Sequence, residues 1–288
     1  MKISKNRIFL TAYIFGILVF FLYLAFPSDS VKTYLANRLS GINPQIRVTI
    51  ERVKPAVPPG VRLLKVDLYH QERFWGSIED LKIVPRLLSL FGSETSFSFK
   101  GNAYAGQIKG NAEIGSNSAA AQMIVNTILT GIQVKDVQAI QDVSDYKISG
   151  LLDATLAYKS DVRKQTLKGT FTLNACRVDF AAPLFNQRFL TFKDVRADVV
   201  LNNQTLTIQR CRITGNQLDA SISGSIISNR STAKTALNLN ATLTPHSILW
   251  AQLKKSLPFK LLTGDMSAGQ SFSFKIRGTV DAPEISLN

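Results

Sequence analysis

Apolar and polar residues alternate along most of the chain after residue 46, and this period of two predicts β-strands. The first run alternates Ile46, Val48 and Ile50 with polar residues. Further alternating runs cover residues 61–69, 74–84, 95–99, 103–114, 148–158, 167–180, 189–200, 205–213, 218–227, 236–243, 272–277 and 280–287. Short turns rich in Gly, Asn, Asp and Ser join them, as at Asn202-Asn203. Such short connections predict antiparallel neighbours.

Two segments depart from this alternation and predict short helices. Residues 119–131 place Ile124, Ile128 and Leu129 on one stripe, and residues 245–262 follow the same spacing until Pro258. The stripe of the second segment consists of Ile248, Leu249, Leu253 and Leu257.

The start of the chain predicts a single transmembrane helix. Residues 8–26 contain no charge, and at ~1.5 Å per residue they span close to the ~30 Å hydrocarbon core of a bilayer. Basic residues within positions 1–7 predict a cytoplasmic N-terminus and place the bulk of the chain beyond the membrane. A cleaved signal peptide is the alternative, but the apolar run is longer than usual for one. Representative residues of the predicted span are Ile8, Phe15, Phe20 and Phe26.

A juxtamembrane helix and linker are expected over residues 27–45. Val31, Tyr34, Leu35 and Leu39 follow helical spacing within residues 31–39. The spacing leaves two placements open, one at the membrane surface and one packed on the sheet that follows.

The strand pattern contains a weak repeat that ends in glycine. Ile-Ser-Gly occurs at residues 148–150 and 222–224, and Ile-Arg-Gly occurs at residues 276–278. Repeats of this kind favour an elongated sheet built by addition. We therefore expect a mainly β fold over residues 46–288, an elongated, curved, mostly antiparallel sheet with two short helices and a possible sub-boundary near residues 115–147. Periodicity alone cannot choose between an open curved sheet, a sandwich and a barrel.

Composition excludes several classes of protein. The 288 residues are 45% hydrophobic with only two Cys, which argues against intrinsic disorder and against a disulfide scaffold. The net charge of +14 is spread along the chain. A basic face beyond the membrane could attract anionic headgroups or an acidic partner protein, whereas nucleic acid is not expected there.

The sequence contains no recognisable catalytic motif. His70 and His246 are isolated, so no metal site of known spacing is expected. Ser225 lacks a motif that would activate it, and the glycines near residue 106 lack the spacing of nucleotide-binding loops. We expect neither an enzyme nor a cofactor.

The two cysteines, Cys176 and Cys211, occur in similar contexts, each followed by Arg and a β-branched residue. In an oxidising compartment they could form a cross-strand disulfide, or they could be two buried thiols that never meet.

Two stretches of strand sequence resemble known families. Residues 190–226 and 274–287 resemble the AsmA-like superfamily of membrane-anchored periplasmic proteins, in which an apolar strand, an Asn/Gly turn and a Gly-Ser or Gly-Thr strand recur. Residues 23–69 resemble type II secretion system protein N, GspN. The resemblance implies a single-pass inner-membrane protein whose bulk is periplasmic. It implies a non-enzymatic component of the type II secretion system that contacts other secretion subunits, or alternatively an AsmA-like protein that binds or transfers phospholipid.

The lipid alternative predicts an apolar groove. Two short helices cannot cover one face of more than ten strands, so a curled sheet would leave an apolar trough able to take acyl chains. The alternative is that the same residues form a closed core. The expected lining residues are Phe97, Phe99, Leu152, Leu156, Phe171, Leu173, Val199, Leu201, Leu206, Ile208, Ile222, Leu237 and Leu239.

Overall fold

The computed structural model describes most of the chain after residue 25. It covers residues 13–14, 17, 21, 23, 25–40, 46–57, 59–70, 72–86, 89, 94–117, 120–142, 146–161, 164–184, 187–228, 235–253 and 269–287. These residues form 14 strands, and every strand pair described below is antiparallel and joins strands adjacent in the chain. The prediction of a mainly β, mostly antiparallel fold is confirmed.

The chain divides into two compact units, Met1–Val84 and Pro85–Asn288. The first contains helix α2 (Ser28–Ser40) and strands β1 (Ile46–Ala56), β2 (Gly60–His70) and most of β3 (Arg73–Pro85). The sub-boundary predicted near residues 115–147 stays a prediction; three consecutive strands pair directly with one another over residues 107–160.

Helix α2 packs on the sheet of the first unit. Val31 and Leu35 contact a core of buried side chains that includes Val53 and Leu63, of which Leu63 is 0% exposed. Tyr34 points outward and is 66% exposed. Of the two placements that the sequence left open for residues 31–39, the structure has the helix packed on the sheet, because a three-stranded sheet must cover its apolar face.

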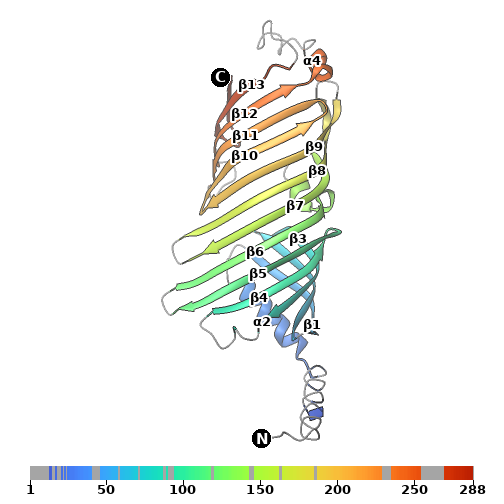
Figure 1. Ribbon diagram of the computed structural model, residues 1–288, viewed down its shortest axis with the longest axis vertical. Helices are drawn as coiled ribbons and strands as arrows, with labels where there is room; N and C mark the ends of the chain where they lie inside the picture. The colour runs from blue at the N-terminus through green and yellow to red at the C-terminus, as the bar shows by residue number, and fades with distance from the viewer. Residues whose placement is uncertain are drawn as a thin grey trace, which may run out of the picture. The chain divides into compact units, whose positions relative to one another are not determined.

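The second unit is a sheet whose strands follow one another in chain order, and Figure 1 shows β4 to β13 stacked in this sequence. The strands are β4 (Glu94–Ala103), β5 (Gly106–Asn117), β6 (Ala120–Gln133), β7 (Lys147–Ser160), β8 (Gln165–Leu184), β9 (Gln187–Asn202), β10 (Thr205–Gly215), β11 (Leu218–Ile227), β12 (Ala236–Pro245), β13 (Phe272–Thr279) and β14 (Pro283–Leu287). Each predicted run from residue 95 onward coincides with one of these strands.

The helix predicted at residues 119–131 is wrong, because most of that segment is strand β6. It pairs with β5 on one side and with β7 on the other. The segment is rich in β-branched residues, such as Val125, Thr127 and Ile128, which favour a pleated strand over a helix. In β6, Ile124 and Ile128 lie on the opposite face from Leu129, so the three residues predicted to share a helical stripe do not share a face.

Short helices lie between strands. A 3-10 turn (Val134–Asp136) and helix α3 (Gln138–Gln141) connect β6 to β7, and helix α4 (Ser247–Leu253) follows β12. Helix α4 confirms the start of the helix predicted at residues 245–262, and the prediction for residues 254–262 lies outside the described residues.

The glycine of each Ile-x-Gly motif has a positive φ, a backbone conformation that residues with a side chain rarely adopt. Gly150, Gly224 and Gly278 have φ values of +146°, +135° and +90°. Gly150 lies at a register shift between β7 and β8, and Gly224 lies at one between β10 and β11. Glycine adopts such values without the steric cost that a Cβ imposes, so Gly150 and Gly224 accommodate the register shifts at their positions.

Among the residues described, no helix combines the length and the apolar character needed to cross a membrane. The predicted span over residues 8–26, including Ile8, Phe15 and Phe20, lies largely outside the described residues; Phe26 is described and packs near the core of the first unit.

Candidate functional site

One face of the second unit's sheet carries most of the apolar residues of strands β4 to β14. Side chains that lie opposite each other in an antiparallel pair share a face, so the register traces rows of side chains across the sheet. We call this face the apolar face. One of its rows is Phe97, Ala112, Val125, Tyr158, Leu167, Leu201, Leu206, Ile226, Leu237, Gly278 and Pro283, in the order of the strands.

Two neighbouring rows are also continuous over the same strands. They are Phe99, Gly110, Thr127, Leu156, Gly169, Val199, Ile208, Gly224, Leu239, Ile276 and Ile285, and Gly101, Ile108, Leu129, Ala154, Phe171, Ala197, Cys211, Ile222, Ala241, Phe274 and Leu287. A fourth row runs through Ile132, Leu152, Leu173, Val195, Ile213, Ala220, Leu243 and Phe272. These four rows contain no Asp, Glu, Lys, Arg or His.

Every residue predicted from the sequence to line a groove lies in one of these rows. The prediction was limited by the helix assigned to residues 119–131, which hid Met123, Val125 and Leu129. The glycines and alanines of the rows were also missed, because a small residue adds little to a hydrophobic pattern. The β-branched residues Val125, Thr127 and Ile128 were the signal that could have identified this segment as a strand.

The opposite face, the polar face, carries hydroxyl, amide and charged side chains. Ser221, Ser223 and Ser225 of β11 lie beside Thr242, Asn240 and Asn238 of β12. Cross-strand and local ion pairs join Arg196 to Asp194 at 2.7 Å, Arg177 to Asp179 at 2.7 Å and Arg210 to Asp198 at 3.4 Å. The exposed apolar exceptions on this face include Ile128, Leu151, Phe189 and Ile227, at 41%, 46%, 39% and 51% exposed.

Side-chain size and exposure distinguish an open face from a closed core. On the apolar face several small residues are buried, including Ala103, Ala154 and Ala220, whereas all the predicted lining residues are half-buried. In a closed core the large side chains are the most completely buried. Among described residues the largest fully buried side chains, Leu63 and Val53, both belong to the first unit. The described part of the second unit therefore has the character of a single open layer.

Helix α4 covers the apolar face at one end. Leu249 and Trp250 are each 5% exposed and pack with Phe272, which is 3% exposed. The rings of Trp250 and Phe272 stack with centroids 5.5 Å apart. Phe272 is thus buried where α4 lies over it. Ile132 of the fourth row, two residues before the 3-10 turn, is also buried at 4% exposed, and the other large residues of the rows are half-buried or exposed.

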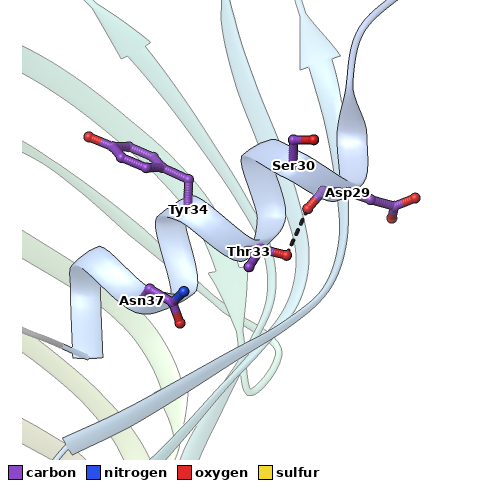
Figure 2. A pocket seen from close by; sticks show the side chains of 5 residues that line it. All are labelled: Asp29, Ser30, Thr33, Tyr34 and Asn37. Carbon is purple, nitrogen blue, oxygen red and sulfur yellow. Dashed lines mark hydrogen bonds between the residues drawn. The ribbon is translucent and has the colours of Figure 1, made fainter.

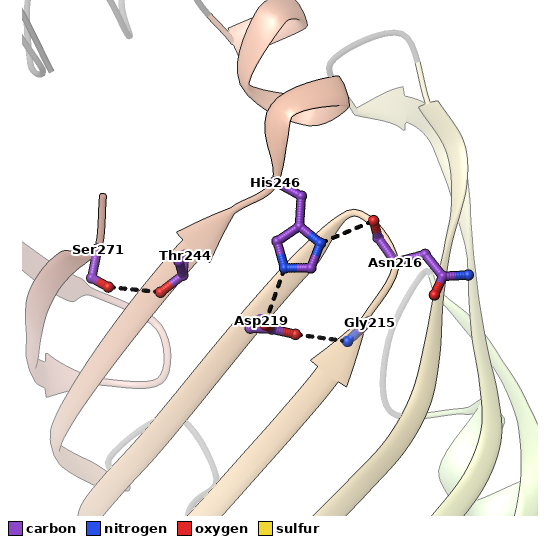
Figure 3. A network of polar contacts seen from close by, with 6 residues as sticks. All are labelled: Gly215, Asn216, Asp219, Thr244, His246 and Ser271. Atoms are coloured by element: carbon purple, nitrogen blue, oxygen red, sulfur yellow. Dashed lines mark hydrogen bonds and ion pairs between the residues drawn. The ribbon is translucent and has the colours of Figure 1, made fainter. Parts of the chain in front are cut away.

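A polar network ties the start of α4 to the sheet (Figure 3). His246 Nε2 lies 3.0 Å from Asp219 Oδ2, and His246 Nδ1 lies 3.0 Å from the carbonyl oxygen of Asn216. The Gly215 N–H donates to Asp219 Oδ1 at 2.9 Å. Since carboxylate and carbonyl oxygens only accept, both imidazole nitrogens donate, and this requires the protonated ring.

The electrostatics agree with this geometry. The Asp219 carboxylate and the Asn216 carbonyl raise the pKa of His246 above its ordinary value. Partial burial raises the pKa of Asp219, but the Gly215 N–H and His246 outweigh it, and the pKa of Asp219 is lowered. Sequence reasoning treated His246 as an isolated residue, because its partner lies 27 positions earlier on β11.

The remaining candidate residues do not form a reactive site. Cys176 and Cys211 are free thiols, so the disulfide is not present and the alternative of two separate thiols holds. Cys176 lies opposite Phe192 and Cys211 opposite Ala197, which places them well apart along β9. Burial raises the pKa of both thiols. His70 lies beside Trp75, with ring centroids 6.0 Å apart.

A shallow hollow lies along α2 and is lined by Asp29, Ser30, Thr33, Tyr34 and Asn37 (Figure 2). The Thr33 hydroxyl donates to the Asp29 carbonyl at 3.0 Å, an ordinary bond between neighbouring helical turns. Within the described residues no group of three or more His, Cys, Asp or Glu could hold a metal ion.

Comparisons of the chain with protein-family models, with curated proteins and with solved structures found no match. The resemblance to GspN and to AsmA-like proteins therefore stays a prediction from the sequence.

Proposed function

We propose that this chain is a non-enzymatic lipid-binding protein that holds the acyl chains of phospholipids on the apolar face of its second unit. The observation that carries the proposal is the combination of four uncharged rows with large side chains that are only half-buried. Covering apolar surface that is otherwise in contact with water is favourable by about 25 cal/mol per Å², so a face left open in this way favours an apolar ligand.

The dimensions of the face suit acyl chains. Strands lie about 4.8 Å apart, so a row that crosses the eleven strands from β4 to β14 extends over about 50 Å. Side chains on one face of a strand repeat every two residues, so four rows are about 20 Å wide. One acyl chain occupies about half of the ~30 Å hydrocarbon core of a bilayer. Several chains could therefore lie side by side in a groove of this size.

At two glycines of the second row, large neighbouring side chains occupy the space above the backbone and make the surface uneven. At Gly169 a Cβ atom would lie 2.6 Å from the Phe171 ring and 3.1 Å from Leu156, so these large side chains lean over the glycine. At Gly110 a Cβ atom would lie 2.5 Å from the Phe99 ring. An acyl chain is flexible enough to follow such an uneven surface.

The test is lipid analysis of the full chain purified from membranes, compared with two variants of one strand. Ile208 belongs to the apolar face and Thr207, its neighbour on β10, belongs to the polar face. We expect stoichiometric phospholipid in the wild type, loss of most of it in Ile208→Lys, and no loss in Thr207→Lys. Wild-type protein that contains no phospholipid, or equal loss in both variants, would contradict the proposal.

The predicted role in type II secretion rests on the resemblance of residues 23–69 alone. Crosslinking in membranes followed by mass spectrometry of proteins and lipids addresses both roles. Secretion subunits without stoichiometric lipid favour the secretion role, and phospholipid without those subunits favours the lipid-binding role.

A further inference from the structure

The hairpin of β8 and β9 extends beyond the strands on either side of it. On β8, residues after Asp179 pass the start of β7, because Asp179 pairs with Lys147, the first residue of β7. On β9, residues before Phe192 pass the end of β10, because Phe192 pairs with Gly215, the last residue of β10. We call residues 180–184 and 187–191 the β8–β9 ribbon.

The ribbon has an unusual surface for a projecting hairpin. Ala181, Ala182 and Pro183 are exposed, and Phe189 is 39% exposed. Arg188 is exposed and is the one ionisable side chain among the described ribbon residues, which include no acid. A two-stranded ribbon is only marginally stable in water by itself, and an apolar surface of this kind on such a ribbon marks an interaction site.

The base of the ribbon combines aromatic rings with basic residues. Tyr146 and Phe180 form an edge-to-face pair with centroids 5.6 Å apart. The Arg177 guanidinium lies 3.9 Å above the centre of the Phe189 ring. Aromatic rings and basic side chains together are typical of the interface between lipid and water, where apolar rings enter the acyl region and cations remain near the phosphates.

Charge complementarity identifies the lipid. We define the base of the ribbon as Tyr146, Lys147, Arg177 and Asp179. Arg177 is paired with Asp179, so among these described residues and those of the ribbon the unpaired charges are the positive ones of Lys147 and Arg188. Basic residues at a membrane surface are attracted to anionic headgroups, and acidic ones are not.

We propose that the β8–β9 ribbon docks on the surface of an anionic phospholipid bilayer and is the point where lipid enters the apolar face. The register shifts after Asn174 on β8 and before Asp194 on β9 bring Cys176 and Phe192 onto the apolar face. Val178 and Leu190, which pair with each other two residues further on, continue that face into the ribbon. This proposal rests on the proposed function, since it names where the ligand of the apolar face would enter.

The experiment places a photoreactive benzoylphenylalanine at single positions in the full chain, reconstituted in vesicles of phosphatidylethanolamine and phosphatidylglycerol. Phe189 probes the ribbon. Ile227, which is 51% exposed at the opposite end of the strands, is the matched control. We expect at least about fivefold more lipid adduct at position 189 than at 227, the size of effect that about 1 kcal/mol of surface attraction produces. Equal yields at the two positions, or adducts at 189 to protein only, would overturn docking on a bilayer.

A charge change tests the role of the anionic lipid. Arg188→Glu should lower the adduct yield at position 189 by about fivefold, because each basic residue near an anionic surface contributes an attraction of that order. Lys164→Glu, an equal charge change at the opposite end of the strands, should leave the yield unchanged. Equal effects of the two variants would overturn the proposed specificity.

A third probe position separates this proposal from the proposed function. Leu239 lies on the apolar face, far from the ribbon along the rows. Acyl-chain adducts at 239 without adducts at 189 would overturn the docking site and leave lipid binding intact. Adducts at 189 without adducts at 239 would support docking and contradict acyl-chain binding on the apolar face.

Discussion

His246 donates through Nε2 to Asp219 at 3.0 Å and through Nδ1 to the carbonyl of Asn216 at 3.0 Å, so one imidazolium joins the start of α4 to the turn between β10 and β11. The backbone follows the same arrangement, since the His246 N–H donates to Gln217 O and the His246 carbonyl accepts from the Trp250 N–H. Helix α4 has no titratable residue among Ser247–Leu253, so Asp219 on β11 is the charged group that faces His246 in the described structure.

Stability should therefore fall as pH rises through the folded-state pKa of His246. A raised pKa means that the contribution of His246 is complete below its unfolded pKa of about 6.5 and is lost above the folded value. Asp219, whose pKa is lowered, contributes above its unfolded value and loses that contribution only in acid. The pair is partly exposed, so the effect is about 0.2–1 kcal/mol. Unfolding temperature measured from pH 5 to pH 9 should decline in the wild type, and this decline should be smaller in His246→Gln and Asp219→Asn.

The two tryptophans of the chain offer a matched test of what α4 covers. Trp250 is 5% exposed and stacks on Phe272, whereas Trp75 is 53% exposed. Trp250→Ala should destabilise by about 3–5 kcal/mol, the usual range for a buried aromatic residue, and Trp75→Ala by less than about 1 kcal/mol. Denaturant unfolding measures both, and equal losses would contradict the assignment of Trp250 to a local core. Binding of a hydrophobic dye should rise in Trp250→Ala, because the end of the apolar face becomes exposed.

The glycines of the Ile-x-Gly motif should tolerate alanine poorly. At Gly224, φ is +135° and a Cβ atom would lie 2.2 Å from the backbone oxygen of Asn238, which cannot move aside without breaking strand pairing. Gly131, which lies outside the motif, is the control. Its φ is +66° and a Cβ atom would meet no other atom within 4 Å, so only the backbone strain remains. Gly224→Ala should cost about 3 kcal/mol or more and Gly131→Ala about 1 kcal/mol. Thermal unfolding of both variants checks the ranking.

Strand positions and the apolar face follow from the sequence because each depends on a short-range pattern. The alternation at Leu206, Ile208 and their neighbours specifies both the strand and which face each residue occupies. The helix prediction for residues 119–131 was wrong because a short apolar run with β-branched residues is compatible with both the helical period of 3.6 and the strand period of two. His246 and Asp219 could not be paired from the sequence, since their contact depends on the register between β11 and β12, where Asp219 lies opposite Thr244. The Ile-x-Gly motif was visible, but its positive φ values were not.

The free thiols give a direct measure of the state of the apolar face. In denaturant without reductant, both Cys176 and Cys211 should react with an alkylating reagent, because the structure has no disulfide between them. In the folded protein both should react slowly, since burial raises the pKa of each thiol and lowers its thiolate fraction. If neither Cys176 nor Cys211 is alkylated under denaturing, non-reducing conditions, the mass spectrum would contradict this prediction.

Cys211 should also report whether lipid covers the apolar face. It lies between Ala197 and Ile222 in the third row and is half-buried, whereas Cys176 is 4% exposed. If acyl chains occupy the rows, they exclude the reagent from Cys211. Alkylation of Cys211 should therefore be several-fold faster after lipid is removed with detergent, and it should slow again when phospholipid is restored. Cys176 is the internal control, because neighbouring side chains already cover it. Peptide mass spectrometry of the time course at mildly alkaline pH measures both rates, and a rate at Cys211 that does not respond to lipid would mean that the acyl chains do not lie over the third row.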